Sequence, residues 1–225
     1  NLNFSVLSVE FFVIGNEYAI QAVPSQNYKF MIICTPAKSY YDNQEIWVKI
    51  EEKYSRAARG GVGYAKAAGN YAAQFYPTQI AKDEGFQQII WTDSNNHNRI
   101  EEAGTMNLFF KINDTLITSP TSDSILDGVT RKSIIEIAKS INISVEEREI
   151  TVDELLTAHK SGTLKEIFGT GTAVTVLPIS GFGYRGNRFS IISNEEKTSD
   201  LLKIKLNNIQ YAKTNDFSNW QYKIT

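Results

Sequence analysis

The chain has 225 residues, of which 42% are hydrophobic and 12% aromatic, enough apolar surface for one large folded domain over residues 1–225. Charged residues make up 21% and the formal net charge is −2, which argues against a disordered chain and against a basic nucleic-acid-binding surface. One cysteine and two histidines exclude an intramolecular disulfide and leave too few ligands for a cysteine-rich or histidine-based metal site, so we expect no metal.

The first third of the chain alternates strand signals with turn formers. Runs rich in β-branched and aromatic residues predict strands. A helical pattern follows from about residue 67 to residue 85, and Pro77 is expected to kink or split it. The three predicted strands cover residues 4–15, 28–36 and 46–50.

The middle of the chain combines strands with one strong helix. A buried strand is predicted over residues 86–93, and a hairpin over residues 100–119 with its turn at residues 112–114. An amphipathic helix follows over residues 126–142, with Asp127 as its N-cap. Its apolar face is expected to carry Ile134, Ile135, Ala138 and Ile141.

The last third continues the mixture. A strand over residues 144–150 precedes a helix capped by Thr151, and a strand, a tight glycine turn and a second strand follow over residues 166–180. A strand over residues 187–192 and a helix over about residues 194–212 complete the pattern. Because strands and helices mix without a strict βαβ rhythm, we expect an α+β fold with a mixed, barrel-like sheet.

Lys66 is the first residue that suggests chemistry. It lies between two segments of glycine and alanine, with no carboxylate beside it. One interpretation is a solvated lysine in a flexible loop, because lysine is almost never buried without cause. The other is a nucleophile: an amine in a desolvated pocket has a lowered pKa and forms a Schiff base with a carbonyl substrate or with pyridoxal phosphate.

The second interpretation requires partners elsewhere in the chain. Pyridoxal phosphate needs a carboxylate for its ring nitrogen, a donor for its ring oxygen and backbone amides for its phosphate. Glu102, on a predicted strand, is the candidate carboxylate, and its neighbour Glu101 should point to the opposite face. Tyr71 is the candidate donor. The candidate phosphate-binding residues, at a helix start and in a tight turn, are Gly128, Val129, Thr130, Thr170, Gly171, Thr172 and Ala173.

Several segments together resemble the class IV pyridoxal-phosphate-dependent aminotransferases, and most of all the branched-chain amino acid aminotransferases. The segments are residues 66–71, 101–110, 126–133 and 166–173. The spacing of the class signature fits throughout, and the resemblance covers essentially all 225 residues. The positions that match the signature are Glu102, Gly104, Asn107, Phe109, Leu116, Thr118, Leu126, Gly128, Val129 and Arg131.

The resemblance implies a large cofactor domain of fold-type IV and a set of roles. Lys66 would bind the cofactor as a Schiff base and move the proton between the substrate Cα and the cofactor carbon. Tyr71 would hydrogen-bond the ring oxygen, and Glu102 would pair with the pyridine nitrogen. The other implied cofactor contacts are with Gly128, Val129, Thr130, Gly171 and Thr172. The implied substrate contacts are with Tyr40, Thr105, Thr172 and Ala173.

The sequence departs from the family pattern at its start. The small domain that precedes the first strand in the family is expected to be absent, together with its phosphate-binding arginine. Ser8 and Glu10 stand where the family has an aromatic residue and an arginine, so the handling of a dicarboxylate substrate is in doubt. Val174 and Leu177 replace a cysteine pair of some animal relatives, which argues against that kind of redox control.

The implied reaction transfers the amino group of leucine, isoleucine or valine to 2-oxoglutarate, with an amino acid and a 2-oxo acid as the only small-molecule partners. A D-amino acid aminotransferase, an aminodeoxychorismate lyase and a non-catalytic relative or fragment stay open as alternatives. The family implies a homodimer. The sequence has no apolar run of roughly 20 residues and no basic signal-peptide region, so we expect no membrane partner and a cytoplasmic location.

Overall fold

A computed structural model describes residues 6–37, 45–192, 196–214 and 219–222. The chain divides into two compact units, residues 1–42 and residues 43–225. The prediction that residues 1–225 form a single cofactor-binding domain stays a prediction. No helix among the described residues is long and apolar enough to cross a membrane.

The first unit is a two-stranded antiparallel ribbon. Strand β1 (Val6–Gly15) pairs with strand β2 (Tyr28–Ala37), and both strands lie where the sequence predicts strands. Phe11 and Phe30 stack on the ribbon with ring centroids 6.2 Å apart. Both residues are more than 60% exposed, because a single ribbon offers no second layer to cover its apolar side chains.

The second unit contains two five-stranded sheets, with strand orders β10-β9-β6-β7-β8 and β12-β11-β3-β4-β5. Both sheets mix parallel and antiparallel pairs, since β7 pairs with β8 and β3 pairs with β4 in parallel. The strands are β3 (Trp47–Ile50), β4 (Gln88–Thr92), β5 (Ile100–Ala103), β6 (Asn107–Ile112), β7 (Thr115–Thr118), β8 (Ser144–Glu147), β9 (Leu164–Gly171), β10 (Thr175–Ile179), β11 (Gly181–Tyr184) and β12 (Asn187–Ser190). The predicted α+β fold with mixed sheets is confirmed, and neither sheet closes into a barrel within the described residues.

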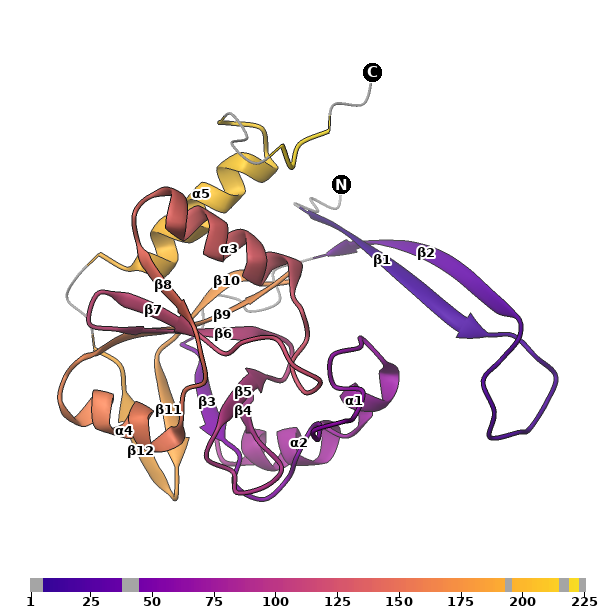
Figure 1. The fold of residues 1–225 in the computed structure, drawn as a ribbon, viewed down its shortest axis with the longest axis horizontal. Coiled ribbons are helices and arrows are strands. Elements are labelled where there is room, and N and C mark those ends of the chain that lie inside the picture. The colour runs from indigo at the N-terminus through magenta and orange to yellow at the C-terminus, as the bar shows by residue number, and fades with distance from the viewer. Residues whose placement is uncertain (1–5, 38–44, 193–195, 215–218, 223–225) are drawn as a thin grey trace. The chain divides into compact units, whose positions relative to one another are not determined.

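Five helices are described, and two of them cover the first of these sheets (Figure 1). Ile134 and Leu202, from the two covering helices, pack with Phe109 and Phe168 of the sheet in one buried cluster. The Phe109 and Phe168 rings stack at 5.1 Å. The helices are α1 (Ala68–Ala72), α2 (Phe75–Asp83), α3 (Val129–Ser140), α4 (Val152–Lys160) and α5 (Thr198–Gln210), of which α3 and α5 cover the sheet.

One local prediction is wrong, one is made more exact, and one strand has no counterpart among the predicted elements. The predicted N-cap Asp127 is wrong: Gly128 is the N-cap of α3, and Asp127 pairs with Lys132 at 2.5 Å instead. The predicted split near Pro77 does occur, but it falls before the proline, which lies in the first turn of α2 where no intrahelical N–H is needed. Strand β11 has two glycines and was not predicted.

Candidate active site

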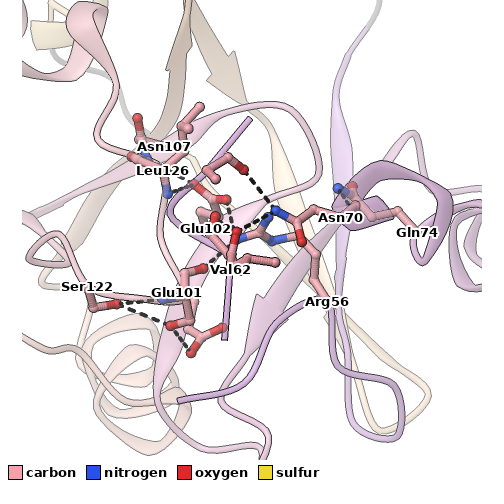
Figure 2. Close-up of polar contacts among 12 residues, drawn as sticks. Arg56, Val62, Asn70, Gln74, Glu101, Glu102, Asn107, Ser122 and Leu126 are labelled. Carbon is pink, nitrogen blue, oxygen red and sulfur yellow. Dashed lines mark hydrogen bonds and ion pairs between the residues drawn. The ribbon is translucent and has the colours of Figure 1, made fainter. Parts of the chain in front are cut away.

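Glu102 lies on β5 and is 5% exposed. Its Oε2 atom accepts hydrogen bonds from the Asn107 side-chain amide at 3.0 Å and from the Leu126 backbone N–H at 3.1 Å. Its Oε1 atom lies 2.7 Å from the Arg56 guanidinium (Figure 2). An ionised carboxylate oxygen accepts about two hydrogen bonds. Oε2 is therefore saturated, whereas Oε1 keeps one acceptor position that no described residue occupies.

Arg56 follows β3 and is as deeply buried as its partner. Its Nη2 atom donates to the Gly63 carbonyl at 3.2 Å and to the Ser124 carbonyl, in addition to the ion pair with Glu102. Figure 2 shows the Arg56 guanidinium directed at the Glu102 carboxylate. The guanidinium thus connects β5, the glycine-rich loop and the segment before α3.

The two adjacent glutamates of β5 are both buried, but they have separate partners. Glu101 accepts a 2.6 Å hydrogen bond from the Ser124 hydroxyl, whereas Glu102 contacts Arg56, Asn107 and Leu126. Burial raises the pKa of Glu102 to about 7, although the charge of Arg56 and the Leu126 amide oppose this. Burial also raises the pKa of Glu101. Glu102 is consequently poised to gain a cationic partner, which would favour its ionised form.

The loop that carries Lys66 is held by a buried asparagine. The Asn70 side-chain amide donates to the carbonyls of Val62 and Ala65, both at 2.8 Å. A Cβ atom on Gly63 would lie 2.7 Å from Ser124 Cα, so only glycine lets the loop pack this closely. Lys66 itself is exposed and forms no hydrogen bond or ion pair with the part of the chain that the structure describes. The backbone around it is fixed while its amine is available.

Tyr71, the predicted donor, lies on the short helix α1 and is half-buried. Burial raises the pKa of its phenol, and the nearby Glu102 charge raises it further, while Arg56 acts in the opposite direction. The phenol therefore keeps its proton at neutral pH and can donate a hydrogen bond. This electrostatic coupling places Tyr71 in the surroundings of Glu102 and Arg56.

The N-terminus of α3 also lies against this cluster. Gly128 packs so closely on Asn107 that an added Cβ would lie 2.1 Å from the Asn107 side-chain oxygen. Helix α3 begins without a side-chain cap and without an acidic residue in its first turn. The amides of Val129 and Thr130 are thus the first of an uncapped helix start, which favours an anion.

The β5–β6 turn and the β9–β10 turn lie close together. The Thr105 carbonyl would lie 3.1 Å from a Cβ atom on Gly171, and Asn107 pairs with Thr170 in the sheet. The side chains of Thr105, Thr172 and Ala173 are exposed there. The Thr170 hydroxyl is buried and has no hydrogen-bond partner among the described residues.

The structure thus gathers most of the predicted residues, with two additions. Glu102, Tyr71 and Gly128 are connected through Arg56 and Asn107, and the two turns approach each other. Tyr40 lies outside the described residues. Sequence reasoning missed Arg56 and treated Asn107 only as a matching position. The only sequence signal for Arg56 is its position seven residues before Gly63, in a segment that has no clear polar face.

The comparisons with known proteins show the family of this chain. The profile of the family described as amino-transferase class IV matches residues 4–182. The chain belongs to the class IV aminotransferase family, the pyridoxal-phosphate-dependent family that its motifs resemble.

Named members of the family match most of this chain. It is 38% identical over 205 residues to a Bacillus subtilis protein named branched-chain-amino-acid aminotransferase 2, covering 90% of this chain and 56% of the relative. It is 40% identical over 215 residues to a Staphylococcus aureus protein named probable branched-chain-amino-acid aminotransferase, covering 93% of this chain and 60% of the relative. This chain therefore spans less than two thirds of the length of these relatives.

Solved structures share the fold at lower identity. A branched-chain aminotransferase from Thermoproteus uzoniensis superimposes with a TM-score of 0.81 at 21% identity, covering 95% of this chain and 68% of the other. The Escherichia coli branched-chain amino acid aminotransferase gives 0.80 at 23% identity, covering 94% and 68%. The fold-type IV architecture predicted from the motifs is confirmed.

The residues present fit pyridoxal phosphate. A protonated ring nitrogen needs a carboxylate oxygen with a remaining acceptor position, and Glu102 Oε1 provides one. A phosphate needs an uncapped helix start, and α3 provides it beside Gly128. The orphaned Thr170 hydroxyl next to Gly171 is a further polar group without a protein partner.

Proposed function

We propose that the protein is a transaminase that moves the amino group of branched-chain L-amino acids to 2-oxoglutarate with pyridoxal phosphate bound to Lys66. The observation that carries the proposal is the buried Glu102 carboxylate, which has one acceptor position left and lies near Tyr71, Gly128 and the loop of Lys66. The names of the relatives at 38% and 40% identity support the choice of substrate.

When bound, the cofactor supplies an electron-withdrawing ring that stabilises negative charge at the substrate Cα. Glu102 would hold the ring nitrogen protonated, and Tyr71 would donate a hydrogen bond to the ring oxygen. Lys66 would hold the cofactor through its amine and would carry a proton to and from the substrate Cα. Its exposed amine and fixed backbone suit that movement.

The remaining predicted residues would hold the cofactor phosphate and the substrate α-carboxylate. The N–H groups of Val129 and Thr130, beside Gly128, and the turn of Gly171 and Thr172 would bind the phosphate. Thr105, Thr172 and Ala173 would line the substrate side, with the amides of the Thr172–Ala173 turn available for the α-carboxylate, while Tyr40 stays a prediction from the sequence. The same proposal includes a homodimer, which light scattering tests. It also includes a cytoplasmic location, which imaging of a tagged full-length protein tests.

Covalent labelling tests the cofactor assignment. Pyridoxal phosphate is added to the purified protein, which is reduced with borohydride and digested. Peptide mass spectrometry is expected to place the phosphopyridoxyl group on Lys66. K66A should take up none, whereas K53A, which removes an exposed lysine of the preceding segment, should label like the parent. A group on another lysine, or no group at all, would reject the assignment.

A substrate screen tests the reaction. Leucine, isoleucine and valine are compared with D-alanine and aminodeoxychorismate, each with 2-oxoglutarate where an acceptor is needed. Turnover of the three branched-chain amino acids is expected. Turnover of D-alanine alone or of aminodeoxychorismate alone would replace the branched-chain assignment, and labelling of Lys66 without any turnover would favour a non-catalytic relative.

A further inference from the structure

We propose that Arg56 is a positioning residue that keeps Glu102 ionised and, through the same guanidinium, sets the position of the Lys66 loop relative to Glu102. This inference rests on the proposed function and deepens it. Arg56 would contact neither substrate nor cofactor; it would act through Glu102 and through the loop. Three observations carry the inference.

The first observation is the division of labour between the two oxygens of Glu102. Asn107 and the Leu126 amide occupy Oε2, and Arg56 donates to Oε1. The acceptor position left for a ring nitrogen is therefore on the oxygen that Arg56 already contacts. The Arg56 guanidinium and the protonated ring nitrogen would then share one oxygen. The strength of the Arg56 contact therefore determines how much negative charge Glu102 offers to the ring nitrogen.

The second observation is that the charge of Glu102 depends on few neighbours. Besides burial, the groups that act on it are Arg56 from the segment after β3, the Leu126 backbone N–H and Glu101 from its own strand, while Glu102 in turn acts on Tyr71 of α1. Arg56 is the only cation among them. Burial and Glu101 both favour the neutral acid, and a neutral acid would not hold a pyridine nitrogen protonated.

The third observation is that the guanidinium is also a mechanical link. It donates to the Gly63 carbonyl, three residues before Lys66, and to the Ser124 carbonyl. Gly63 packs against Ser124 Cα, and Asn70 fixes the two carbonyls on either side of Gly63. All three contacts are made by the single Nη2 atom, while Nε is buried without a hydrogen-bond partner among the described residues. The permanent charge and rigid plane of the guanidinium hold this atom among one carboxylate and two carbonyls, whereas an ammonium sits on a flexible stem.

The test separates charge from packing with two substitutions at Arg56. R56Q removes the charge but keeps an amide donor, and R56K keeps the charge but loses the rigid, planar guanidinium. R56M serves as a second neutral variant if R56Q does not fold. R131Q is the matched control, because Arg131 is equally buried and also donates to a backbone carbonyl and pairs with a carboxylate, Glu147.

The first measurement uses the protein without cofactor. The titration midpoint of Glu102 is followed by carbon NMR of labelled glutamate side chains, with E102Q assigning the signal. The midpoint is expected near pH 7 in the parent and about one to three units higher in R56Q. It should stay close to the parent value in R56K and R131Q. An unchanged midpoint in both neutral variants would overturn the inference.

The second measurement is the affinity for pyridoxal phosphate as a function of pH. For a shift of one unit, the ionised fraction of Glu102 at pH 7 falls from about a half to about a tenth, so R56Q should bind about five-fold more weakly. The deficit should close above the new midpoint. A deficit of equal size at every pH would mean that Arg56 only supports packing, and would also overturn the inference.

The third measurement addresses the loop. Amide hydrogen exchange of residues 60–67 in the protein without cofactor is expected to rise in R56K and R56Q and to remain at the parent level in R131Q. Unchanged exchange in both Arg56 variants would overturn the link to the Lys66 loop. If the parent protein bound no pyridoxal phosphate but the midpoint still moved, the proposed function would fail while the electrostatic role of Arg56 stood.

Discussion

Two buried carboxylates of the second unit have similar burial and different surroundings. Glu102 on β5 and Glu166 on β9 are each 5% exposed. Glu166 accepts hydrogen bonds from the Thr198 N–H at 2.7 Å, the Ser199 N–H at 3.0 Å and the Ser199 hydroxyl at 2.7 Å, so it closes the start of helix α5. Its cation, Lys111, is 3.8 Å away, whereas Arg56 is 2.7 Å from Glu102.

The difference separates a structural carboxylate from one suited to binding. Both oxygens of Glu166 accept hydrogen bonds from backbone N–H groups at the start of α5, which stabilises a helix that packs on the sheet. Glu102 and Glu166 each accept two hydrogen bonds on one oxygen and one contact on the other, but the single contact of Glu102 is a 2.7 Å ion pair with an arginine, whereas that of Glu166 is a helix amide. Neither burial nor the number of accepted hydrogen bonds therefore identifies the functional glutamate; the chemical nature of its partners does.

The largest expected effect is on activity. E102Q should lower the rate of transamination by about 10²- to 10³-fold, because a neutral amide cannot hold the ring nitrogen protonated. Steady-state rates, together with circular dichroism to establish folding, measure this. E166Q is the matched control and should retain its activity per folded molecule. Equal losses in the two variants would abolish the distinction between the carboxylates.

The next effect is on the pH dependence of stability in the protein without cofactor. The pKa of Glu102 is about 7 in the folded state against an ordinary value of 4.5, so between these values the folded state holds a proton that the unfolded state has released. The free energy of unfolding should therefore fall as pH rises from about 4.5 to about 7, by on the order of 2–3 kcal/mol from this group, and then level off. Glu101 contributes with the same sign.

Urea unfolding at several pH values measures this dependence. E102Q should lose the contribution of Glu102 and show a flatter profile over the same range, while E166Q should keep the slope of the parent. A parent profile that rises between pH 4.5 and pH 7 by as much as the expected fall would contradict the raised pKa of Glu102.

The smallest effect is on the stability of the helix cap. E166Q should lower the free energy of unfolding by about 2 kcal/mol, because one acceptor oxygen becomes a donor that faces the amides of α5. Equilibrium urea unfolding at fixed pH measures it. T151A, which removes the hydroxyl that caps α4 at 3.0 Å, is a neutral comparison with an expected loss of about 1 kcal/mol. A larger loss in T151A than in E166Q would contradict the ranking.

Much of the fold could be predicted because its signals are local. The turn between β6 and β7 was expected at residues 112–114, and Asn113 takes a positive φ of 51° there. Thr151 caps α4 as expected. The N-cap of α3 was missed because Asp127 and Gly128 both favour that position locally, and the close packing of Gly128 against Asn107 places the helix start one residue later.

The sequence by itself determined the family and the mixed fold, and it predicts Lys66, Tyr71 and Glu102 as a related set, since these follow from motifs with specific spacing. Only the tertiary structure decided how Glu102 is surrounded. Its partners come from the segment after β3, from β6 and from the segment before α3, which lie up to 46 residues away in the chain. Burial, an ion pair and saturated acceptor positions depend on distances across the fold, and no local pattern carries them.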